Sequence, residues 1–392
     1  MSSQSLKPGW KLVKFGDVVR QCKESVDRNN NSFDRYIEGG HMNSENIHIR
    51  RWGEFGSDYV GPAFHRIFRK GQVLYGSRRT YLKKVAVADF DGITANTTFI
   101  CESRDQNTFM QELLPFLMLT DSFTEHSIRE SKGSTNPYIN WPDIAKYEFP
   151  LPPLEEQKRI AEILWAADEA LEYNVSLKRT AQKLYLATIE NLLFDKENKE
   201  VRVEQLANIN RATLSESRTP KDFHFKYLDI GAVIAPKIIG ELSSYSFSDA
   251  PSRARRVVED YDILLSTVRP NLKSFVQVKE LTEVVIASTG FAVLSPKTRV
   301  IGSILFHAFF SKRFADFCDA KVTGTNYPAI SAKDISGFKV RIPNNDEDLI
   351  ATAKTIDAIE DAISNIDFNI SQLSVLKKAL TKKTFSPYNQ IK

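Results

Sequence analysis

Three residues in the first half of the chain have the types and the order of a metal-dependent nuclease site. They are Asp143, Glu156 and Lys158. In such enzymes two acids hold Mg²⁺ and a lysine assists the attacking water. The second half keeps Asp334 in the place of Asp143, but it has Leu349 where the lysine belongs. Glu156 also lies where a helix N-terminus favours an acid. Metal-dependent cleavage is therefore an alternative and not the leading prediction.

A second fragment, Thr135-Asn136-Pro137-Tyr138, is similar to the Asn-Pro-Pro-Tyr box of adenine methyltransferases. One proline is missing, and the second half has Tyr327-Pro328-Ala329 instead. The sequence contains neither Gly-x-Gly-x-x-Gly nor Gly-x-x-x-x-Gly-Lys-Ser/Thr. Its six histidines, at positions 41, 48, 65, 126, 224 and 307, lack the spacing of metal ligands. We predict no catalytic residue, no metal site and no cofactor bound by this chain.

Composition limits the class of protein further. With 42% hydrophobic and 26% charged residues, the 392-residue chain is expected to form several packed domains. Its three cysteines form no Cys-x-x-Cys pair, which argues against a zinc ribbon or a disulfide framework. No apolar run approaches the ~18 residues that span a bilayer, and the N-terminus has no apolar signal core. We therefore expect a cytoplasmic protein that does not associate with membranes.

The two halves of the chain repeat each other as copies of a unit of about 190 residues. Residues 133–144 align without a gap on residues 324–335, and residues 73–83 align on residues 263–273. Two further blocks near the start of each half correspond in the same order. Four matching blocks in one order indicate a duplication, so any functional residue in one half is expected to have a counterpart in the other.

The first 150 residues or so of each unit alternate short β-branched and aromatic runs with turn residues, which predicts strands. The clearest runs cover residues 72–75, 84–88 and 97–101 in the first half, and 262–265 and 274–278 in the second. Apolar residues at three-to-four spacing predict helices at 109–120 and 303–317. Each globular part is therefore predicted to be mixed α/β.

Each unit is predicted to end in a long helix. In the first unit, prolines end the preceding strand, and nothing breaks a helix from Leu154 to about Phe194. In the second, isoleucines alternate at spacings of three and four, an a/d seam that needs a partner helix. The predicted packing residues are Ile160, Leu164, Ala167 and Leu171 in the first helix, continuing to Leu177 and Leu184, and Ile356, Ile359, Ile363, Ile366, Ile370 and Leu373 in the second. We favour an intramolecular coiled coil; the alternative is that these helices form the core of one large domain.

The boundary between strand and helix carries a family resemblance. Residues 151–164, Leu-Pro-Pro-Leu-Glu-Glu-Gln-Lys-Arg-Ile-Ala-Glu-Ile-Leu, follow the motif Asn-Trp-Pro-Asp-Ile at residues 140–144. This stretch strongly resembles the specificity subunit of type I restriction-modification systems, and the likeness extends over the whole chain. The second half departs from the motif, with Asn-Asn-Asp-Glu-Asp at residues 344–348. That departure leaves the start of the second helix open.

The resemblance implies a specific architecture: two globular target-recognition domains separated by two long helices packed as an antiparallel coiled coil, with a pseudo-twofold internal repeat. The expected segments are residues 1–150 and 201–345 for the recognition domains, and residues 151–200 and 346–392 for the helical spacers. Each recognition domain is expected to bind one half of a bipartite site in double-stranded DNA. DNA-methylation subunits, two in number, and a restriction and translocation subunit are the implied partners. S-adenosylmethionine, ATP and Mg²⁺ are expected on those partners.

Candidate DNA contacts lie at corresponding positions of the two halves. Arginines and lysines there can neutralise phosphates, and an arginine can also bind a guanine edge. Small polar loops offer hydroxyl, amide and backbone donors for similar contacts. The candidates are Arg78, Arg79, Lys83, Lys84, Ser134, Thr135 and Asn136 in the first half, and Arg269, Asn271, Lys273, Thr325, Asn326 and Tyr327 in the second.

The sequence thus favours a non-catalytic, sequence-specific DNA-binding subunit. Two alternatives from other classes remain at this point: the Mg²⁺-dependent nuclease, and a scaffold whose paired domains bind protein.

Overall fold

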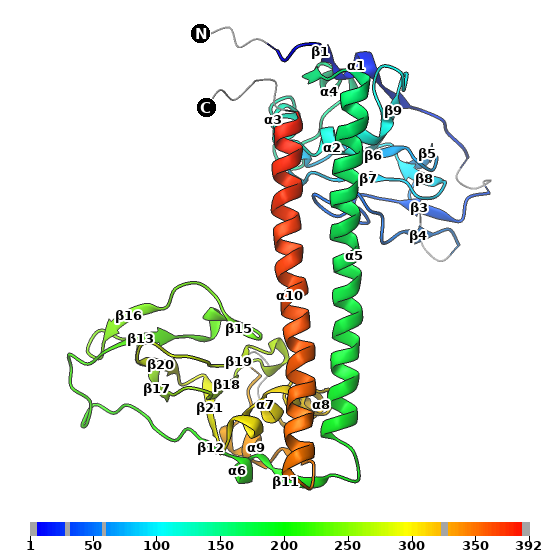
Figure 1. The fold of residues 1–392 in the computed structure, drawn as a ribbon. Helices are drawn as coiled ribbons and strands as arrows, with labels where there is room; N and C mark the ends of the chain where they lie inside the picture. Colours follow the sequence, from blue (N-terminus) through cyan, green and yellow to red (C-terminus); the bar gives the residue numbers. More distant parts are fainter. Residues whose placement is uncertain (1–5, 28–31, 57–59, 323–327, 386–392) are drawn as a thin grey trace. The chain divides into compact units, whose positions relative to one another are not determined.

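The structure is a computed structural model, and it describes residues 6–27, 32–56, 60–322 and 328–385. The chain divides into two compact units. Unit 1 consists of Met1–Asn174 with Asn369–Lys392, and unit 2 consists of Val175–Phe368. The two long helices, labelled α5 and α10 in Figure 1, each contribute one part to each unit. The four segments expected from the sequence stay a prediction, because this division cuts through both helices.

Unit 1 contains two four-stranded sheets and one two-stranded sheet. The sheets have the strand orders β2-β9-β6-β7, β4-β3-β8-β5 and β1-β10. All neighbours are antiparallel except β3 and β8. The elements are β1 Lys11–Lys14, α1 Phe15–Val18, β2 Val19–Cys22, β3 Arg35–Ile37, β4 Gly53–Glu54, β5 Phe64–Phe68, β6 Val73–Gly76, η1 Thr80–Leu82, β7 Val85–Val87, β8 Gly92–Ala95, β9 Thr98–Ser103, η2 Gln111–Leu113, α2 Leu114–Met118, α3 Asp121–Arg129, α4 Trp141–Ile144 and β10 Glu148–Leu151.

Unit 2 repeats this topology with different residues. Its corresponding sheets have the orders β12-β21-β18-β19, β16-β13-β20-β17 and β11-β22, and β13 and β20 form the parallel pair. A short β14-β15 hairpin has no counterpart among the described residues of unit 1. The elements are β11 Lys199–Arg202, α6 Val203–Leu206, β12 Ala207–Ile209, β13 His224–Leu228, η3 Ile230–Ala232, β14 Val233–Ile234, β15 Lys237–Ile238, β16 Ser243–Ser246, β17 Ala254–Val258, β18 Ile263–Ser266, η4 Pro270–Leu272, β19 Phe275–Gln277, β20 Val285–Ser288, β21 Phe291–Pro296, α7 Arg299–Ala308, α8 Lys312–Lys321, α9 Ala332–Gly337 and β22 Lys339–Ile342.

The fold class expected from the sequence is confirmed. Both units are mixed α/β, and the five predicted strands correspond to β6, β7, β9, β18 and β19 within one or two residues at each end. In each unit an aromatic-rich core lies between sheet and helices, with Phe15, Phe123 and Phe149 fully buried in unit 1 and Phe309 and Phe314 in unit 2. The strand orders of the two units match, so the duplication seen in the sequence is also present in the topology.

Two of the shorter helices differ from expectation. The predicted helix at 303–317 is two helices, α7 and α8. The break lies at Ser311, whose hydroxyl accepts a hydrogen bond from the Phe314 N–H at 3.1 Å and so starts a new helix. The predicted helix at 109–120 is the short pair η2 and α2, and α3 follows it without having been predicted. Thr120 caps α3 in the same way, because its hydroxyl accepts a hydrogen bond from the Phe123 N–H at 3.2 Å.

A side-chain cap marks the start of the second long helix. Helix α5 spans Leu154–Leu193, and α10 spans Asp346–Thr384. The side chain of Asn345 accepts a hydrogen bond from the Asp348 N–H at 2.8 Å, and its amide donates to the Asp348 carboxylate at 2.8 Å. This reciprocal cap replaces the proline motif of the first half and fixes the start that the sequence left open.

The packing face of α5 differs in part from the predicted stripe. Ile160, Leu164 and Ala167 are buried, but Leu177 and Leu184 are 39% and 57% exposed. Partly buried positions instead continue with heptad spacing through residues that are mainly polar or small: Leu171, Asn174, Lys178, Ala181 and Tyr185. Assigning Leu177 and Leu184 to the packing face was therefore wrong, because a search for apolar residues lost the heptad phase at these positions. On α10, Ile356 is buried and the other five predicted positions are partly buried.

Side-chain contacts give the direction of the two helices within each unit. In unit 2, Lys178 of α5 pairs with Asp367 of α10 at 2.5 Å. Further along α5, the Tyr185 hydroxyl lies 2.6 Å from Nδ1 of His307, whose Nε2 lies 2.9 Å from Asp357, an earlier residue of α10. In unit 1, Asp168 of α5 pairs with Lys377. Within unit 2 the helices therefore run antiparallel, whereas knobs-into-holes packing stays a prediction.

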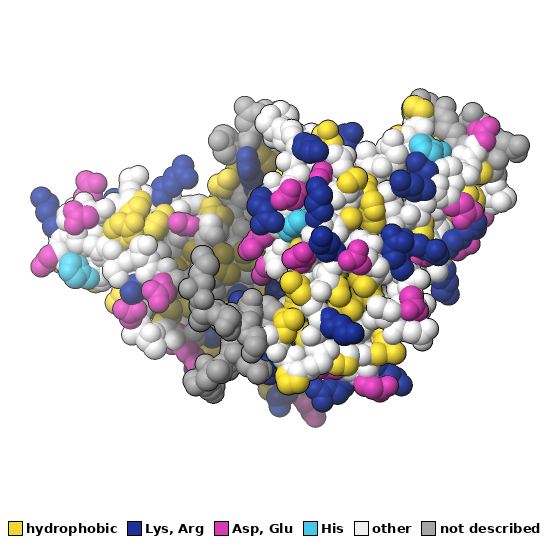
Figure 2. All heavy atoms as spheres, turned by 90° about the horizontal axis from the view of Figure 1, so that it is seen from above, with side chains coloured by type: hydrophobic (Ala, Val, Ile, Leu, Met, Phe, Trp, Pro, Cys, Tyr) yellow, Lys and Arg dark blue, Asp and Glu magenta, His cyan; other side chains and the backbone are white. Residues whose placement is uncertain are grey.

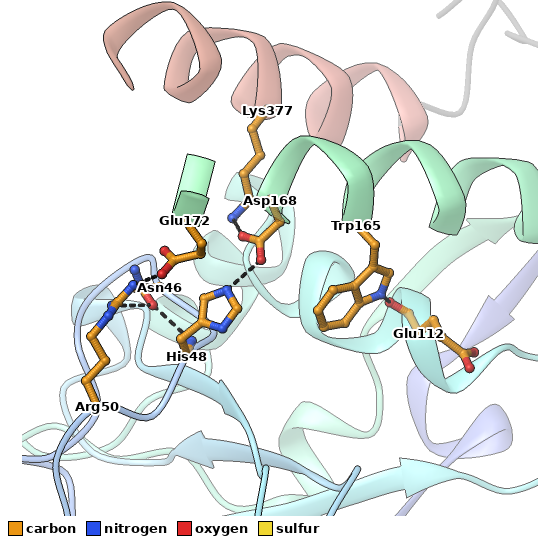
Figure 3. Close-up of polar contacts among 8 residues, drawn as sticks. All are labelled: Asn46, His48, Arg50, Glu112, Trp165, Asp168, Glu172 and Lys377. Carbon is orange, nitrogen blue, oxygen red and sulfur yellow. Dashed lines mark hydrogen bonds and ion pairs between the residues drawn. The ribbon is translucent and has the colours of Figure 1, made fainter. Parts of the chain in front are cut away.

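In unit 1, several polar contacts attach the globular part to α5, and two of them are made by Asp168 and Glu172 (Figure 3). The Nε2 atom of His48 lies 2.6 Å from the carboxylate of Asp168, which also binds Lys377, and Arg50 pairs with Glu172. The Asp168 side chain is only 1% exposed. Burial alone raises the pKa of Asp168, but hydrogen bonds from His48 and Lys377 outweigh it, so the pKa lies below its ordinary value. Asp168 is thus a buried, charged residue that joins three segments of unit 1.

None of the helices in the described part of the chain is both long and apolar enough to cross a membrane.

Candidate nucleic-acid interface

The predicted basic residues lie on a β-hairpin that both units contain. In unit 1, β6 and β7 pair with Val73 opposite Val87, and their connection includes η1. In unit 2, β18 and β19 pair in the same way around η4. We call residues 79–83 and 269–273 the crests of these hairpins. The duplication therefore places Arg79 and Lys83 in the same local structure as Arg269 and Lys273.

Both crests have an unusual backbone. Arg79, Lys83, Arg269 and Lys273 all lie in the left-handed region, with φ between 48° and 51°. A non-glycine residue in this region costs on the order of 1 kcal/mol, so four of them in equivalent places require compensating contacts. Sequence reasoning missed this feature, because arginine and lysine carry no signal for positive φ.

Hydrogen bonds to neighbouring loops supply those contacts, and they are the same in both units. The Arg79 N–H donates to the Pro137 carbonyl at 2.7 Å, and the Arg269 N–H donates to the Pro328 carbonyl at 2.7 Å. At the base of each crest the hydroxyls of Ser77 and Thr267 donate to backbone carbonyls at 2.7 and 2.9 Å. In unit 1, the predicted basic turn and the predicted polar loop are therefore brought together.

The predicted basic residues differ in how many hydrogen bonds and ion pairs they form within the protein. Arg78 and Arg79 are exposed, and the Arg79 guanidinium donates to the Asn136 side chain at 3.2 Å. Lys83 forms ion pairs with Asp121 at 2.6 Å and Glu45 at 3.3 Å. Burial on its own lowers the pKa of Lys83, but these two carboxylates more than offset that effect and raise it.

The remaining lysines also have internal partners. Lys84 donates to the Gly39 carbonyl, and Lys273 donates to the Phe310 carbonyl at 3.3 Å. Both side chains are partly buried. The lysines thus hold the hairpins in place within their units, and the exposed arginines are better placed to contact phosphate.

The polar loop of unit 1 is open to solvent. Ser134, Thr135 and Asn136 are exposed, and the preceding Gly133 has a φ of 86°, which only glycine adopts readily. Asn271 is exposed on the crest of unit 2. The predicted contacts Thr325, Asn326 and Tyr327 lie outside the described residues.

The residues of the nuclease alternative have other partners. Asp143 forms ion pairs with Lys132 and Lys146, each at 3.2 Å, and these hydrogen bonds lower its pKa. The Glu156 carboxylate accepts a hydrogen bond from the Trp10 indole at 2.9 Å. Within the described ranges, Asp143 and Glu156 belong to no group of three potential metal ligands. This arrangement favours a structural role for both acids.

One cluster of potential ligands escaped the sequence analysis. His307, Asp357 and Glu360 have ligand atoms within 4.8 Å of one another; His307 lies on α7, and the two acids lie on α10. His307 is 1% exposed and lies between the Tyr185 hydroxyl and the Asp357 carboxylate, which also accepts from Ser303 at 2.7 Å. These are hydrogen-bond distances, and they describe a buried network that joins α7 to both long helices of unit 2.

Charges of both signs are mixed on the face of the molecule drawn in Figure 2. On this face, dark blue lysines and arginines are interspersed with magenta acids, and they form no continuous basic patch. This agrees with a net charge of only +4. Any DNA contact must therefore depend on local groups such as the crests and not on the overall charge of the protein.

Comparison with known proteins finds one matching family model. Residues 7–179 match the family model of the type I restriction modification DNA specificity domain. The match covers somewhat less than half of the chain, and it falls on the first of the two repeated units. Among curated relatives, the EcoDI specificity subunit of Escherichia coli is 28% identical over 178 residues, which are 44% of this chain and 38% of that protein. The HindI specificity subunit of Haemophilus influenzae is 24% identical over 47% of this chain and 41% of its own length. The matched regions thus span about two fifths of these two relatives.

A longer sequence match covers most of the chain, and two solved structures share its fold. The MjaVIII specificity subunit of Methanocaldococcus jannaschii is 24% identical over 95% of this chain and 91% of that protein. The fold is similar to a type I S subunit from M. genitalium, with a TM-score of 0.63, 15% identity, and coverage of 99% of this chain and 100% of that one. A chain from a type I restriction-modification system has a TM-score of 0.56, with 20% identity over 97% and 98% of the two chains. These structures support the two-domain architecture.

Proposed function

We propose that this chain is a type I specificity subunit, that it binds a bipartite site in double-stranded DNA, and that each unit recognises one half of it. The observation that carries the proposal is the pair of crests. Each unit holds a strained, arginine-bearing turn with the same backbone hydrogen bonds. Backbone strain of this kind costs stability and is found mainly at functional sites, so its presence in both units supports a functional role for the crests. Two equivalent surfaces on two units suit two half-sites.

The two units would recognise different sequences, because the surface residues around the crests differ while the backbone is repeated. Flanking arginines would contact phosphates and orient each unit, and exposed side chains would contact base edges. The long helices, which contribute to both units, would set the distance between the half-sites. This division of roles accounts for a duplication in which topology is kept and surface residues diverge.

The chain itself would carry no catalysis and bind no cofactor. Asp143 and Glu156 support this view, because their carboxylates bind Lys132 and the Trp10 indole. The relatives named above, which are specificity subunits, support it as well. Methylation subunits, two in number, and a restriction and translocation subunit would act at the site that this chain selects. S-adenosylmethionine, ATP and Mg²⁺ would bind to those partners, and the assembly would work in the cytoplasm.

A footprint tests the proposal directly. The chain is purified with its methylation subunits, and protection is mapped on DNA fragments that carry methylated adenines in the host genome. We expect two protected segments separated by a stretch whose sequence is free to vary. One continuous protected site, or protection without sequence preference, would reject recognition by two units. Binding that is absent or insensitive to salt would favour the protein scaffold instead.

A further inference from the structure

The two hairpin crests differ in sequence at two positions, Thr80/Pro270 and Tyr81/Asn271. Each crest is a single 3-10 turn between two left-handed residues. In unit 1 the Leu82 N–H donates to the Arg79 carbonyl at 2.8 Å. In unit 2 the Leu272 N–H donates to the Arg269 carbonyl at 2.9 Å. The backbone of the crest is therefore the same in both units.

The hairpin is also fixed at its base in the same way. The N–H of Ser77 donates to the Thr97 carbonyl at 3.0 Å, and the N–H of Thr267 donates to the Gly290 carbonyl at 2.8 Å. In return, the Ser77 carbonyl accepts from Ile139 at 2.9 Å, and the Thr267 carbonyl accepts from Ile330 at 3.0 Å. These contacts leave the crest little freedom, so a side chain projecting from it has a defined origin.

The middle residue of each turn projects from this rigid base. The first residues of the turns, Thr80 and Pro270, are buried. The middle residues are Tyr81, which is 53% exposed, and Asn271, which is also exposed. The hydrogen bonds that form the turn involve backbone atoms, so the turn does not require the side chain of Tyr81 or Asn271. The position is thus held in place by the protein, open to a partner, and chemically different in the two units.

We propose that Tyr81 and Asn271 are specificity-determining residues, each contacting base edges in one of the two half-sites. This inference rests on the proposed function and adds the residues that discriminate the sequences. The carboxamide of Asn271 has a donor and an acceptor, which match the N7 and N6 groups of adenine in the major groove. Tyr81 offers an aromatic face for the methyl group of thymine, with a hydroxyl at its edge. The neighbouring Arg78 and Arg79 then serve to contact phosphate.

The rigid backbone matters for this role. A loop that rearranges on binding loses part of its interaction free energy to ordering, whereas a preorganised side chain loses less. Misplacement by about 1 Å would also break the two-point hydrogen bond between an amide and adenine. The four left-handed residues thus fix the backbone from which the side chain of Tyr81 or Asn271 projects.

The experiment uses the complete methylation complex and a DNA library in which both half-sites are randomised one position at a time. Methylation of each sequence is counted for the wild type, Tyr81→Ala and Asn271→Ala. Each variant is the matched control for the other, because both truncate an exposed residue at the same place in the fold. Thermal melting of each complex checks that the variants remain folded, and Tyr81→Phe separates the ring from the hydroxyl.

Asn271→Ala is expected to lower the preference for an adenine in one half-site about tenfold or more, and to leave the other half-site unchanged. Tyr81→Ala is expected to relax a thymine preference in the opposite half-site only. A uniform loss of methylation on all sequences, or no change in preference, would overturn the inference, since it would assign the crest to phosphate contact or to no contact. If the wild-type complex itself lacks a bipartite preference, the proposed function fails first, and the two failures are distinct.

Discussion

Replacing Asp168 by alanine should destabilise unit 1 strongly. The Asp168 carboxylate is 1% exposed and compensates Lys377, which is 13% exposed, while also holding His48 at 2.6 Å. Removing one member of a buried ion pair leaves the other charge unpaired and typically costs about 3–5 kcal/mol. For urea unfolding with a slope of about 3 kcal/mol per molar, this corresponds to a midpoint lower by roughly 1 M or more.

Tryptophan fluorescence can measure this effect in the intact chain. All four tryptophans, at positions 10, 52, 141 and 165, lie in unit 1, so the signal reports the unit that contains Asp168. Trp165 itself lies on α5, where its indole donates to the Glu112 carbonyl at 3.0 Å (Figure 3).

A matched control is Glu130→Ala. Glu130 pairs with Arg129 at 3.1 Å, but both side chains are exposed, at 37% and 69%. Exposed pairs contribute about 1 kcal/mol or less, so the control midpoint should move little. An Asp168→Ala midpoint no lower than that of the control would refute the reasoning. Because the folded-state pKa of Asp168 is depressed, its stabilisation should also fall as the pH drops below the ordinary value of 3.8.

Three further predictions address other parts of the molecule. Burial raises the pKa of Glu360, and nearby His307 offsets this effect only in part. The contribution of Glu360 to the free energy of unfolding is therefore fully present below the ordinary pKa of 4.5, and it is lost as the pH rises through the raised pKa. Glu360→Gln should accordingly raise the melting temperature at pH 7 but not at pH 4 in calorimetry, and an equal or lower value at pH 7 would contradict this. Arg79→Ala should weaken DNA binding similarly for all sequences and reduce the slope of log affinity against log salt by about 1, whereas an unchanged slope would place its guanidinium away from phosphate. Burial raises the pKa of the thiols of Cys22 and Cys318 to about 12, and that of the fully buried Cys101 also rises, so Ellman's reagent at pH 8 should react slowly with all three until urea unfolds the chain.

The sequence predicted secondary structure correctly where a local residue pattern determines it. Strand runs such as residues 73–76 alternate with turns, and α5 extends from Leu154 to Leu193 because nothing within it breaks a helix. Local patterns failed where one polar atom decided the outcome. The hydroxyl of Ser311 divided a predicted helix in two, and Lys178, which is partly buried where Leu177 was expected, forms an ion pair with Asp367.

The candidate interface shows the same division. Repetition of basic residues in the sequence identified the crests, since duplicated positions can be compared without a structure. Their left-handed backbone and the exposure of Tyr81 and Asn271 could not be inferred, because both depend on hydrogen bonds to loops far along the chain. Lys83 was expected to be free for phosphate, yet its ammonium lies 2.6 Å from Asp121.

By itself, the sequence determined the duplication, the mixed α/β class and the two long helices, because each of these is recorded in periodic or repeated residue types. Only the tertiary structure decided which cations are engaged, which face of α5 is covered, and which side chains project from the crests. Those outcomes depend on contacts between segments that are distant in sequence, such as Asp168 with Lys377 and Arg79 with Pro137. A residue's type fixes what it can bind, whereas the fold fixes which partner is near enough to bind it.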